Sequence, residues 1–441
     1  MISPDSTACA YRAQLLYFVA DPATLEDPSQ AVRYHSDGLL LVNAQGRIDA
    51  CADYAELARK LPASVPVTHL PGKLIMPGLI DTHLHFPQTD IIASPAPGLL
   101  PWLETYTFPA EGRFGDSDHA REVAGVFLDE LLRNGTTTAL VYGSVHPQSV
   151  DAFFQESHSR NVRMIAGKVM MDRHCPDYLQ DTAESGARES EDLIRRWHGK
   201  GRQLYALTPR FAPTSTPAQL AACGELARAY PDVFVQTHVA ENKDEIQWVS
   251  ELFPHNRSYL DVYDSVGLLR PRAIFGHSIW LDETDRARMR DTGSVAAHCP
   301  TSNLFLASGL FDFQAMRQSS VHHTLATDVG GGTSFSMLRT MNEAHKVARL
   351  GGCHLTATSM FYLATEGAAR ALGMQGQIGT LAPGAEADFI IVDPAATPLM
   401  ARRSSQLDSL EEQLFVLAML GDDRNISASY SAGRCVHRRA A

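Results

Sequence analysis

The sequence LIMPGLIDTHLH, residues Leu74–His85, is typical of a buried strand that ends in metal-ligand side chains. Side chains alternate between the two faces of a strand, so His83 and His85 point the same way, with Cα atoms about 6–7 Å apart. Both imidazoles can then reach one metal ion at about 2.0–2.1 Å. An isolated H-x-H pair is a weak metal signature, so its meaning depends on the rest of the chain.

Strand-like and helical patterns alternate through the middle of the chain. Residues Asp118–Asn134 have apolar side chains at helical spacing, with Ser117 or Asp118 as the cap and Gly135 as the stop. Eight strands are predicted near Leu74–His83, Thr136–Tyr142, Val162–Met170, Leu204–Arg210, Val233–His238, Ala273–His277, Ser294–His298 and His322–Asp328. This alternation predicts an α/β fold, a closed (β/α)8 TIM barrel, with a doubly wound open sheet as the structural alternative.

The two ends of the chain differ from the middle. The apolar runs Gln14–Ala20 and Leu39–Val42, and the later segments Ala387–Val392 and Asn425–His437, read as short strands with turns between them. We therefore expect a small β-sandwich domain formed from both termini. It would comprise residues 1–73 plus 383–441 and be discontinuous, while the barrel would span residues 74–382.

Residues of ligand type stand at the carboxyl ends of the predicted strands. In a barrel these ends meet on one face, where barrel enzymes have their active sites. His238 ends the fifth strand and Asp328 the eighth, and with His83 and His85 they form a plausible divalent-metal site with room for a water. Taken alone, His238 reads as a core histidine and Asp328 as a helix cap. Their joint placement at strand ends favours the metal site.

A metal-activated water needs a group that handles protons. Glu241 lies three residues after His238, where it could take the water proton and pass it to a substrate. The alternative is a solvated acid beside the charged residues 243–245. His277 ends the sixth strand and could orient the water, or it could be a buried histidine without a catalytic role.

The composition excludes several classes of protein. The 441 residues include 50 acidic and 38 basic ones, for a net charge of -12, which argues against a nucleic-acid partner. Seven scattered cysteines without a C-x-x-C pair are typical of a reducing compartment. No signal-peptide pattern and no apolar run of about 20 residues occurs, so we expect a cytoplasmic protein without a membrane partner. The H-x-E…P-C-x-x-C signature of small zinc deaminases is also missing.

Several motifs resemble the amidohydrolase superfamily and, within it, the guanine deaminases. They are PGLIDTHLHFPQ (Pro77–Gln88), WLETYTFPAE (Trp102–Glu111), TPRFAPTST (Thr208–Thr216), THVAEN (Thr237–Asn242), FGHSIWL (Phe275–Leu281), AHCPTSNLFLASGLF (Ala297–Phe311), ATDVGGGTSFSML (Ala326–Leu338) and PGAEADFIIVD (Pro383–Asp393). The resemblance covers most of the chain. It implies hydrolysis of guanine to xanthine and ammonia in purine catabolism, and a homodimer.

The resemblance also implies a role for each site residue. One Zn2+ per chain would be held by four ligands, which are His83, His85, His238 and Asp328. Glu241 would protonate a ring nitrogen and help the amine leave, while His277 and Asp328 would hold the attacking oxygen. Two-metal relatives carry a modified lysine at the end of the fourth strand, where this chain has Arg210, so one metal is expected. Nitrogen and oxygen ligands of this kind also accept iron or manganese.

Substrate contacts follow from the same resemblance. Gln88 would contact the purine, Arg210 its carbonyl edge, and Phe211 its ring. The alternatives are that Gln88 is a loop residue, Arg210 a structural cation at the strand end, and Phe211 an ordinary core residue. The connection Phe86–Asp116 is long and proline-rich, so we expect an irregular segment that covers the substrate. Its Trp102 and Leu103 would wall the pocket. The alternative functions are a deaminase of another aminopurine, a pterin or a triazine, or a non-catalytic assembly protein with the same fold.

Overall fold

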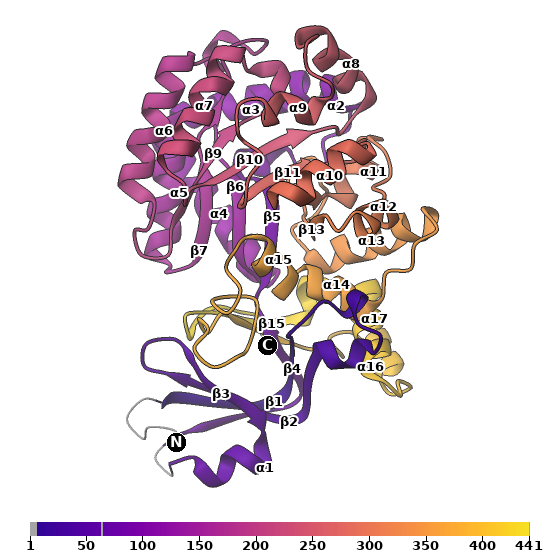
Figure 1. The fold of residues 1–441 in the computed structure, drawn as a ribbon. Coiled ribbons are helices and arrows are strands. Elements are labelled where there is room, and N and C mark those ends of the chain that lie inside the picture. Colours follow the sequence, from indigo (N-terminus) through magenta and orange to yellow (C-terminus); the bar gives the residue numbers. More distant parts are fainter. Residues whose placement is uncertain (1–6, 63–64, 441) are drawn as a thin grey trace.

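The computed structural model describes residues 7–62 and 65–440, and within them the strands form two separate sheets (Figure 1). The upper body in Figure 1 is built around a parallel sheet. Its strands are β5 (Leu79–His85), β6 (Thr136–Tyr142), β7 (Arg163–Gly167), β8 (Val169–Met170), β9 (Leu204–Pro209), β10 (Phe234–Val239), β11 (Ala273–His277), β12 (Val295–His298) and β13 (His322–Leu325). The strand order is β13-β12-β11-β10-β9-β7-β6-β5, with the short β8 also paired to β9.

The two ends of this strand order are joined, so the sheet closes on itself. The backbone N–H of Asp328 donates to the carbonyl of His83 at 2.9 Å, and that of His85 donates to the carbonyl of Val329 at 2.6 Å. Inside the ring, the hydroxyls of Thr82 and Thr324 share a hydrogen bond of 2.6 Å. The predicted TIM barrel is therefore confirmed, and the open-sheet alternative is wrong.

The predicted first strand, Leu74–His83, is in fact divided between the two sheets. Its first residues belong to β4 (Val67–Pro77) of the other sheet, and the barrel strand β5 begins at Leu79 and runs to His85. Gly78 lies at the division, where a Cβ atom would stand 2.0 Å from the hydroxyl of Thr137. Both parts are apolar because both are buried, so the pattern of the sequence could not locate the break.

Helices surround the barrel and supply its connections. They are α2 (Leu99–Trp102), α3 (Phe108–Gly112), α4 (Ser117–Arg133), α5 (Pro147–Ser159), α6 (Ala183–Trp197), α7 (Pro217–Ala229), α8 (Lys243–Leu252), α9 (Tyr259–Asp264), α10 (Glu283–Thr292), α11 (Pro300–Phe305), α12 (Phe313–Gln318), α13 (Met337–Leu350), α14 (Ala357–Leu363) and α15 (Glu366–Ala371). The cap of α4 is Asp116, not Ser117 or Asp118, because its carboxylate accepts from the N–H of Asp118 at 2.9 Å.

The connection between β5 and α4 is not the irregular loop that was expected. It contains a 3-10 helix η4 (Phe86–Ile91), then α2, a π-helix η5 (Leu103–Thr107), α3, and a 3-10 helix η6 (Arg113–Gly115). Its proline residues start or interrupt these pieces rather than prevent helix formation. The other 3-10 helices are η1 (Pro22–Thr24), η2 (Pro28–Ala31), η3 (Ala58–Lys60), η7 (Asp177–Leu179), η8 (Ala212–Thr214) and η9 (Asp423–Asn425).

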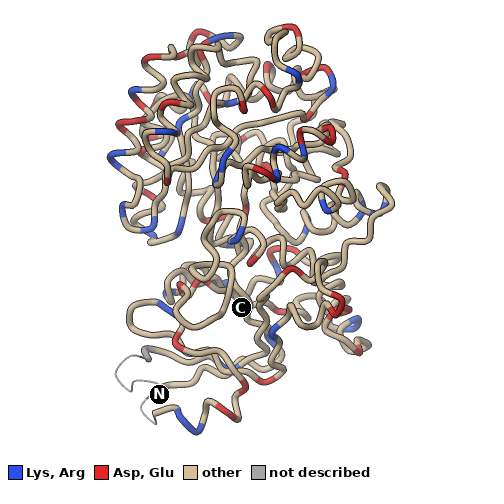
Figure 2. Tube along the Cα trace, viewed as in Figure 1, with Lys and Arg blue, Asp and Glu red and all other residues tan. Residues whose placement is uncertain are grey.

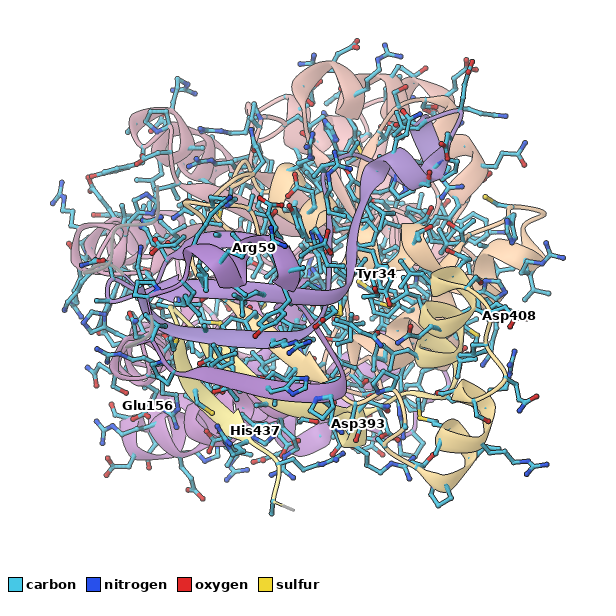
Figure 3. All side chains as sticks on the ribbon, turned by 90° about the horizontal axis from the view of Figure 1, so that it is seen from below. Tyr34, Arg59, Glu156, Asp393, Asp408 and His437 are labelled. Atoms are coloured by element: carbon cyan, nitrogen blue, oxygen red, sulfur yellow. The ribbon has the colours of Figure 1, made fainter. Side chains whose placement is uncertain are left out.

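The second sheet contains strands from both termini, and its strand order is β16-β15-β14-β4-β1-β2-β3. These strands are β1 (Thr7–Phe18), β2 (Val32–Asn43), β3 (Ile48–Asp53), β4, β14 (Phe389–Val392), β15 (Ile426–Ser431) and β16 (Arg434–Arg438). Tyr11 of β1 packs edge-on against Tyr430 of β15 at 5.4 Å, although β4 and β14 separate the two strands. The two layers of the predicted sandwich thus belong to one curled sheet, seen from below in Figure 3.

The inner core of the barrel lies at the amino ends of its strands. It includes Ile80, Leu140, Ile165, Phe234 and Ile274, and residues of α15, such as Ala368 and Ala369, close it from below. The carboxyl ends on the opposite side are left for polar side chains. Apolar packing therefore stabilises one half of the barrel while the other half holds the site.

The C-terminal part of the chain contacts the barrel through a helix. Helix α1 (Tyr54–Leu57) stays with the second sheet, whereas α17 (Leu410–Leu420), which follows α16 (Pro398–Ser404), packs on α13 and α14 of the barrel.

Lysine, arginine, aspartate and glutamate are interspersed over both bodies (Figure 2). No helix of residues 7–62 and 65–440 has the length and apolar character needed to cross a bilayer. All seven cysteines lie in these residues, and none forms a disulfide.

Candidate active site

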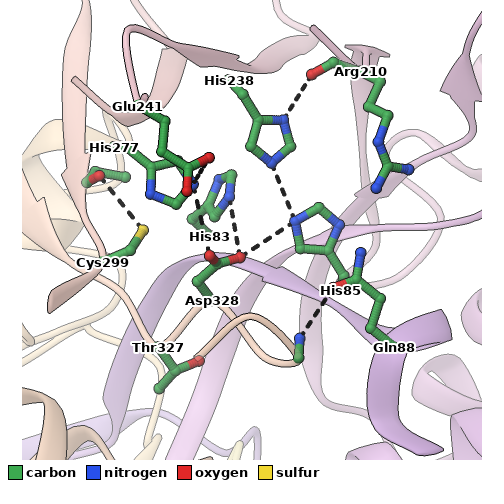
Figure 4. Close-up of polar contacts among 12 residues, drawn as sticks. His83, His85, Gln88, Arg210, His238, Glu241, His277, Cys299, Thr327 and Asp328 are labelled. Atoms are coloured by element: carbon green, nitrogen blue, oxygen red, sulfur yellow. Dashed lines mark hydrogen bonds and ion pairs between the residues drawn. The ribbon is translucent and has the colours of Figure 1, made fainter. Parts of the chain in front are cut away.

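Three histidines and one aspartate converge at the carboxyl ends of three strands (Figure 4). His83 and His85 lie on β5, His238 lies on β10, and Asp328 follows β13. The Nε2 atoms of His83 and His85 lie 3.5 and 3.4 Å from Oδ1 of Asp328. The Nε2 atoms of His85 and His238 are 3.3 Å apart. The structure thus brings together the four predicted ligands, which are separated by up to 245 positions in the chain.

The protonation of these side chains fits a metal centre. Burial lowers the pKa of His85 to about 4 and also lowers the pKa of His83 and His238, so all three rings are neutral and carry a free lone pair. Burial by itself would raise the pKa of Asp328, but the adjacent imidazoles of His83 and His85 outweigh it and keep the carboxylate ionised. Neutral imidazole and ionised carboxylate are the forms that bind metals.

Unpaired polar atoms support the same interpretation. Both ring nitrogens of His83 and Nδ1 of His85 are buried without a hydrogen-bond partner among the described residues. Nδ1 of His238 instead lies 2.7 Å from the carbonyl oxygen of Arg210, which leaves its Nε2 lone pair directed at His85. Two lone pairs that face each other at 3.3 Å repel unless a proton or cation lies between them. The residues therefore fit a divalent cation.

A second group of possible ligands shares two members with this one. It consists of His83, His277, Cys299 and Asp328, whose ligand atoms also lie within 4.8 Å of one another. Burial raises the pKa of the Cys299 thiol well above its ordinary range, and the thiol donates to the carbonyl of Ala297 at 3.6 Å. A neutral thiol is a poor metal ligand, so the set of three histidines and one aspartate is favoured.

Glu241 lies beside this cluster, fully buried in a network of its own. Its Oε2 atom is 3.2 Å from Nε2 of His277, and its Oε1 atom accepts from the hydroxyl of Ser308 at 2.8 Å. Burial, followed by the negative charge of Asp328, raises the pKa of Glu241 to about 8. A carboxyl group with this pKa takes up and releases a proton near neutral pH, as general acid–base catalysis requires.

The orientation of His277 is set from its other side. Nδ1 lies 2.7 Å from Oδ1 of Asn303, an oxygen that can only accept, so Nδ1 carries the proton and Nε2 faces Glu241 and Asp328. His277 and Asp328 have φ values of 69° and 53°, in the left-handed region. Non-glycine residues there cost of order 1–3 kcal/mol each and occur often at functional sites.

The predicted substrate residues surround one pocket next to the cluster. Its lining consists of His85, Gln88, Leu99, Trp102, Leu103, Arg210, Phe211, His238, Glu241, Glu245, His277, Leu306, Asp328 and Gly331. Every site residue predicted from the sequence is in this lining except His83, which lies fully buried beneath it. The segment with η5 and α2 supplies Leu99, Trp102 and Leu103 as an apolar wall. A pocket with few polar groups and an apolar wall is typical of small-molecule sites.

Glu111 lies directly behind two residues of the pocket lining, Gln88 and Arg210, and was not predicted from the sequence. It lies on α3, is fully buried, and accepts from Nε2 of Gln88 at 3.0 Å and from Nη1 of Arg210 at 2.6 Å. It is the last residue of the motif Trp102–Glu111, but nothing in the local pattern indicates that its side chain points inward. Only the fold of the connecting segment places it between β5 and β9.

Two further buried carboxylates, Glu245 in the pocket lining and Asp81 behind it, support the site, and these too were not predicted. Glu245 accepts from the N–H of Glu241 at 3.1 Å and from the hydroxyl of Tyr259 at 2.7 Å. Asp81 accepts from the N–H of Thr327 at 3.1 Å, which ties β5 to the residue before Asp328. Such contacts fix the orientation of the candidate ligands and of Glu241.

Together, the closed barrel and the His-His-His-Asp cluster with a buried glutamate define a hydrolase site of the metal-dependent barrel type. The chain belongs to the amidohydrolase family, whose model matches residues 74–436. It is 48% identical to the guanine deaminase of Escherichia coli (strain K12), over the full length of both chains.

Solved structures give the same relationship. The structure of E. coli guanine deaminase superposes with a TM-score of 0.96 over 98% of this chain and 100% of that chain. A guanine deaminase from C. acetobutylicum with guanine bound in its active site superposes with a TM-score of 0.86, at 25% identity over 97% of this chain and 100% of that chain.

Proposed function

We propose that this chain catalyses the hydrolytic deamination of guanine to xanthine and ammonia, a reaction of purine catabolism. The observation that carries the proposal is one pocket lined by three of the four candidate ligands, with His83 buried beneath it, together with Glu241 and the three polar or aromatic side chains suited to a purine. Its similarity over the whole chain to guanine deaminases supports guanine as the substrate.

In this proposal, His83, His85, His238 and Asp328 would hold one Zn2+ per chain. When bound, the ion supplies a water nucleophile at neutral pH. The ligand atoms alone also suit iron or manganese. Metal analysis of the purified protein identifies the ion, and zinc at about one equivalent is the expected result.

Glu241 moves the protons of the reaction. It accepts a proton from the attacking water and delivers it to a ring nitrogen, so that the carbon bearing the amino group can add the oxygen. It then takes the remaining proton from the added hydroxyl and passes it to the amine, the C–N bond breaks as the new carbonyl forms, and ammonia leaves. Ser308 and His277 hold the two carboxylate oxygens of Glu241 at 2.8 and 3.2 Å, which fixes the direction of transfer.

The pocket side chains suit guanine in particular. Arg210 presents guanidinium donors to the ring carbonyl, the amide of Gln88 presents both a donor and an acceptor to the polar edge, and Phe211 packs against the ring. Trp102 and Leu103 exclude water from the opposite side, which strengthens electrostatic interactions within the pocket.

Ammonia release distinguishes guanine from other substrates. The purified enzyme is assayed with guanine, adenine, 8-oxoguanine and cytosine under identical conditions. We expect guanine to give the highest kcat/KM. Negligible turnover of guanine beside good turnover of another base would contradict the proposed substrate but leave the proposed chemistry in place.

Metal removal tests the proposed chemistry itself. Dialysis against a chelator should abolish ammonia release, and one equivalent of Zn2+ should restore it, because the water is then activated again. Activity that survives complete metal removal contradicts the proposal. Less than about half an equivalent of any metal after metal-replete expression, with no turnover, would favour the non-catalytic assembly protein.

Three further features belong to the proposal. The resemblance to guanine deaminases suggests a homodimer, which sedimentation analysis tests, and a cytoplasmic location. We also propose that the two sheets mark two domains. The expected boundary between residues 73 and 74 moves to Gly78, because β4 keeps residues 74–77 in the second sheet. One domain is then the barrel of residues 78–382, and the other combines residues 1–77 with 383–441, of which 1–6, 63–64 and 441 lie outside the described residues.

A further inference from the structure

We propose that Glu111 is a positioning residue that sets the orientation of Gln88 and Arg210 and thereby determines the preference for a purine with a ring carbonyl. The inference rests on the proposed function. It starts from a juxtaposition that only the tertiary structure creates. A carboxylate from the segment that covers the pocket is fully buried between a side chain that follows β5 and one that follows β9.

Glu111 and the backbone of Gly330 together determine the orientation of the Gln88 amide. An ionised carboxylate can only accept hydrogen bonds, so Glu111 requires the NH2 group of Gln88 on its side. The backbone N–H of Gly330 can only donate, and it requires the amide oxygen at 3.2 Å on the other side. Flipping the amide would oppose donor to donor and acceptor to acceptor. Glu111 and Gly330 therefore permit one orientation, which leaves one N–H and one lone pair of Gln88 for a ligand.

Glu111 also forms a buried ion pair with Arg210, which balances its charge and sets its direction. Its Nη1 atom is bound to Glu111 at 2.6 Å, and its guanidinium lies 5.6 Å from the ring centroid of Phe108. Both charged side chains are almost fully buried, at 3% and 0% exposure for Arg210 and Glu111. The pair is neutral overall, so the pocket offers guanidinium donors without an uncompensated positive charge. Such a site suits a neutral carbonyl better than an anion.

The Arg210–Glu111 pair is connected to the candidate ligand cluster through the backbone of Arg210. The carbonyl oxygen of Arg210 lies 2.7 Å from Nδ1 of His238, so the backbone that carries Arg210 also orients a proposed metal ligand. The carbonyl of Glu111 itself accepts from the hydroxyl of Ser144 at 2.9 Å, which anchors it to the barrel after β6. Glu111 thus joins the covering segment to the binding residues while lying behind them.

The test compares two substrates that differ at the ring carbonyl. Guanine and 2-aminopurine both carry an amino group at the reacting carbon, but 2-aminopurine has no carbonyl for Arg210 to bind. In Glu111→Gln, kcat/KM for guanine should fall by roughly 10- to 100-fold, the size expected for a lost charge-assisted hydrogen bond. The kcat/KM for 2-aminopurine should fall by less than about twofold, so the ratio of the two kcat/KM values should drop by at least about fivefold.

Two further variants complete the test. Glu111→Asp keeps the charge on a shorter side chain, so it should fold like the wild type and give an intermediate ratio. Glu104→Gln is the matched control, because Glu104 is an exposed carboxylate on the same segment, and it should leave both substrates unchanged. Metal content is measured for each protein and should stay at the wild-type level.

Each outcome decides the matter. An unchanged ratio of the two kcat/KM values in Glu111→Gln and Glu111→Asp would overturn the inference. If both values fall equally, Glu111 has a structural role only. If Glu111→Gln does not fold, an unchanged ratio in Glu111→Asp overturns it by itself. Failure of the proposed function is separately visible, because the wild-type enzyme would then fail to turn over guanine.

Discussion

Replacing Glu386 by glutamine is expected to weaken the connection between the second sheet and the barrel. The carboxylate of Glu386 is 7% exposed and accepts from Nε of Arg163 at 2.9 Å and from Nε of Arg202 at 3.1 Å. Arg202 is also paired with Asp388. Burial alone would raise the pKa of Glu386, but the hydrogen bond from Arg163 and the charges of Arg202 and Arg163 outweigh it, and the pKa falls from 4.5 to about 2.

The magnitude follows from this pKa. At about 1.4 kcal/mol for each tenfold change in the acid constant, the difference between 4.5 and about 2 corresponds to roughly 3 kcal/mol of stabilisation of the folded state. The substitution removes the charge and leaves Arg163 buried without its carboxylate, and breaking one half of a buried pair costs about 3–5 kcal/mol. We therefore expect Glu386→Gln to lower the free energy of unfolding by about 3 kcal/mol at pH 7.

Urea unfolding followed by circular dichroism measures this difference, with Glu56→Gln as the matched control. Glu56 forms an exposed ion pair with Lys60, so its loss should cost less than about 0.5 kcal/mol. The folded-state pKa of Glu386 lies below the unfolded-state pKa. Its contribution is therefore complete above pH 4.5 and is lost as the pH falls toward 2. A difference below about 1 kcal/mol at pH 7, or one that does not shrink between pH 5 and 3, would refute the reasoning.

Two substitutions test the roles assigned in the pocket. Glu241→Gln removes the proposed proton-handling group but no proposed metal ligand, so kcat should fall by about 10²- to 10⁴-fold while metal content is unchanged; near-normal turnover would place proton transfer elsewhere. Arg210→Ala removes the proposed donor for the ring carbonyl, so KM for guanine should rise by at least about tenfold with metal retained. Release of metal from the Arg210 variant would indicate that its main role is to support His238 through the backbone.

Most of the site residues could be predicted from local patterns, because the carboxyl end of a strand can be recognised in the sequence. His83 and His85 follow an apolar run, and His238, His277 and Asp328 follow others, so one rule about barrels was enough to place them on one face. The structure brings all of them together. The rule says nothing of residues in the connections, which is why Glu111, Ser308 and Asn303 were missed.

Boundaries were harder to predict where two elements share the same apolar character. The run from Leu74 to His85 reads as one strand, yet it crosses from one sheet into the other at Gly78. The connection 86–116 was expected to be irregular because of its prolines, but it folds into short helices. Proline restricts only its own backbone and that of the residue before it, so it does not exclude helical turns between successive prolines.

The sequence by itself determined the barrel class, the four candidate metal ligands and the glutamate that accompanies them, because burial and strand alternation leave a periodic pattern in the chain. Only the tertiary structure decided which carboxylate faces Gln88 and Arg210, which protons His238 and His277 carry, and how the second sheet is held to the barrel through Glu386. These features depend on the distance and direction between side chains far apart in the chain, and no local pattern records them.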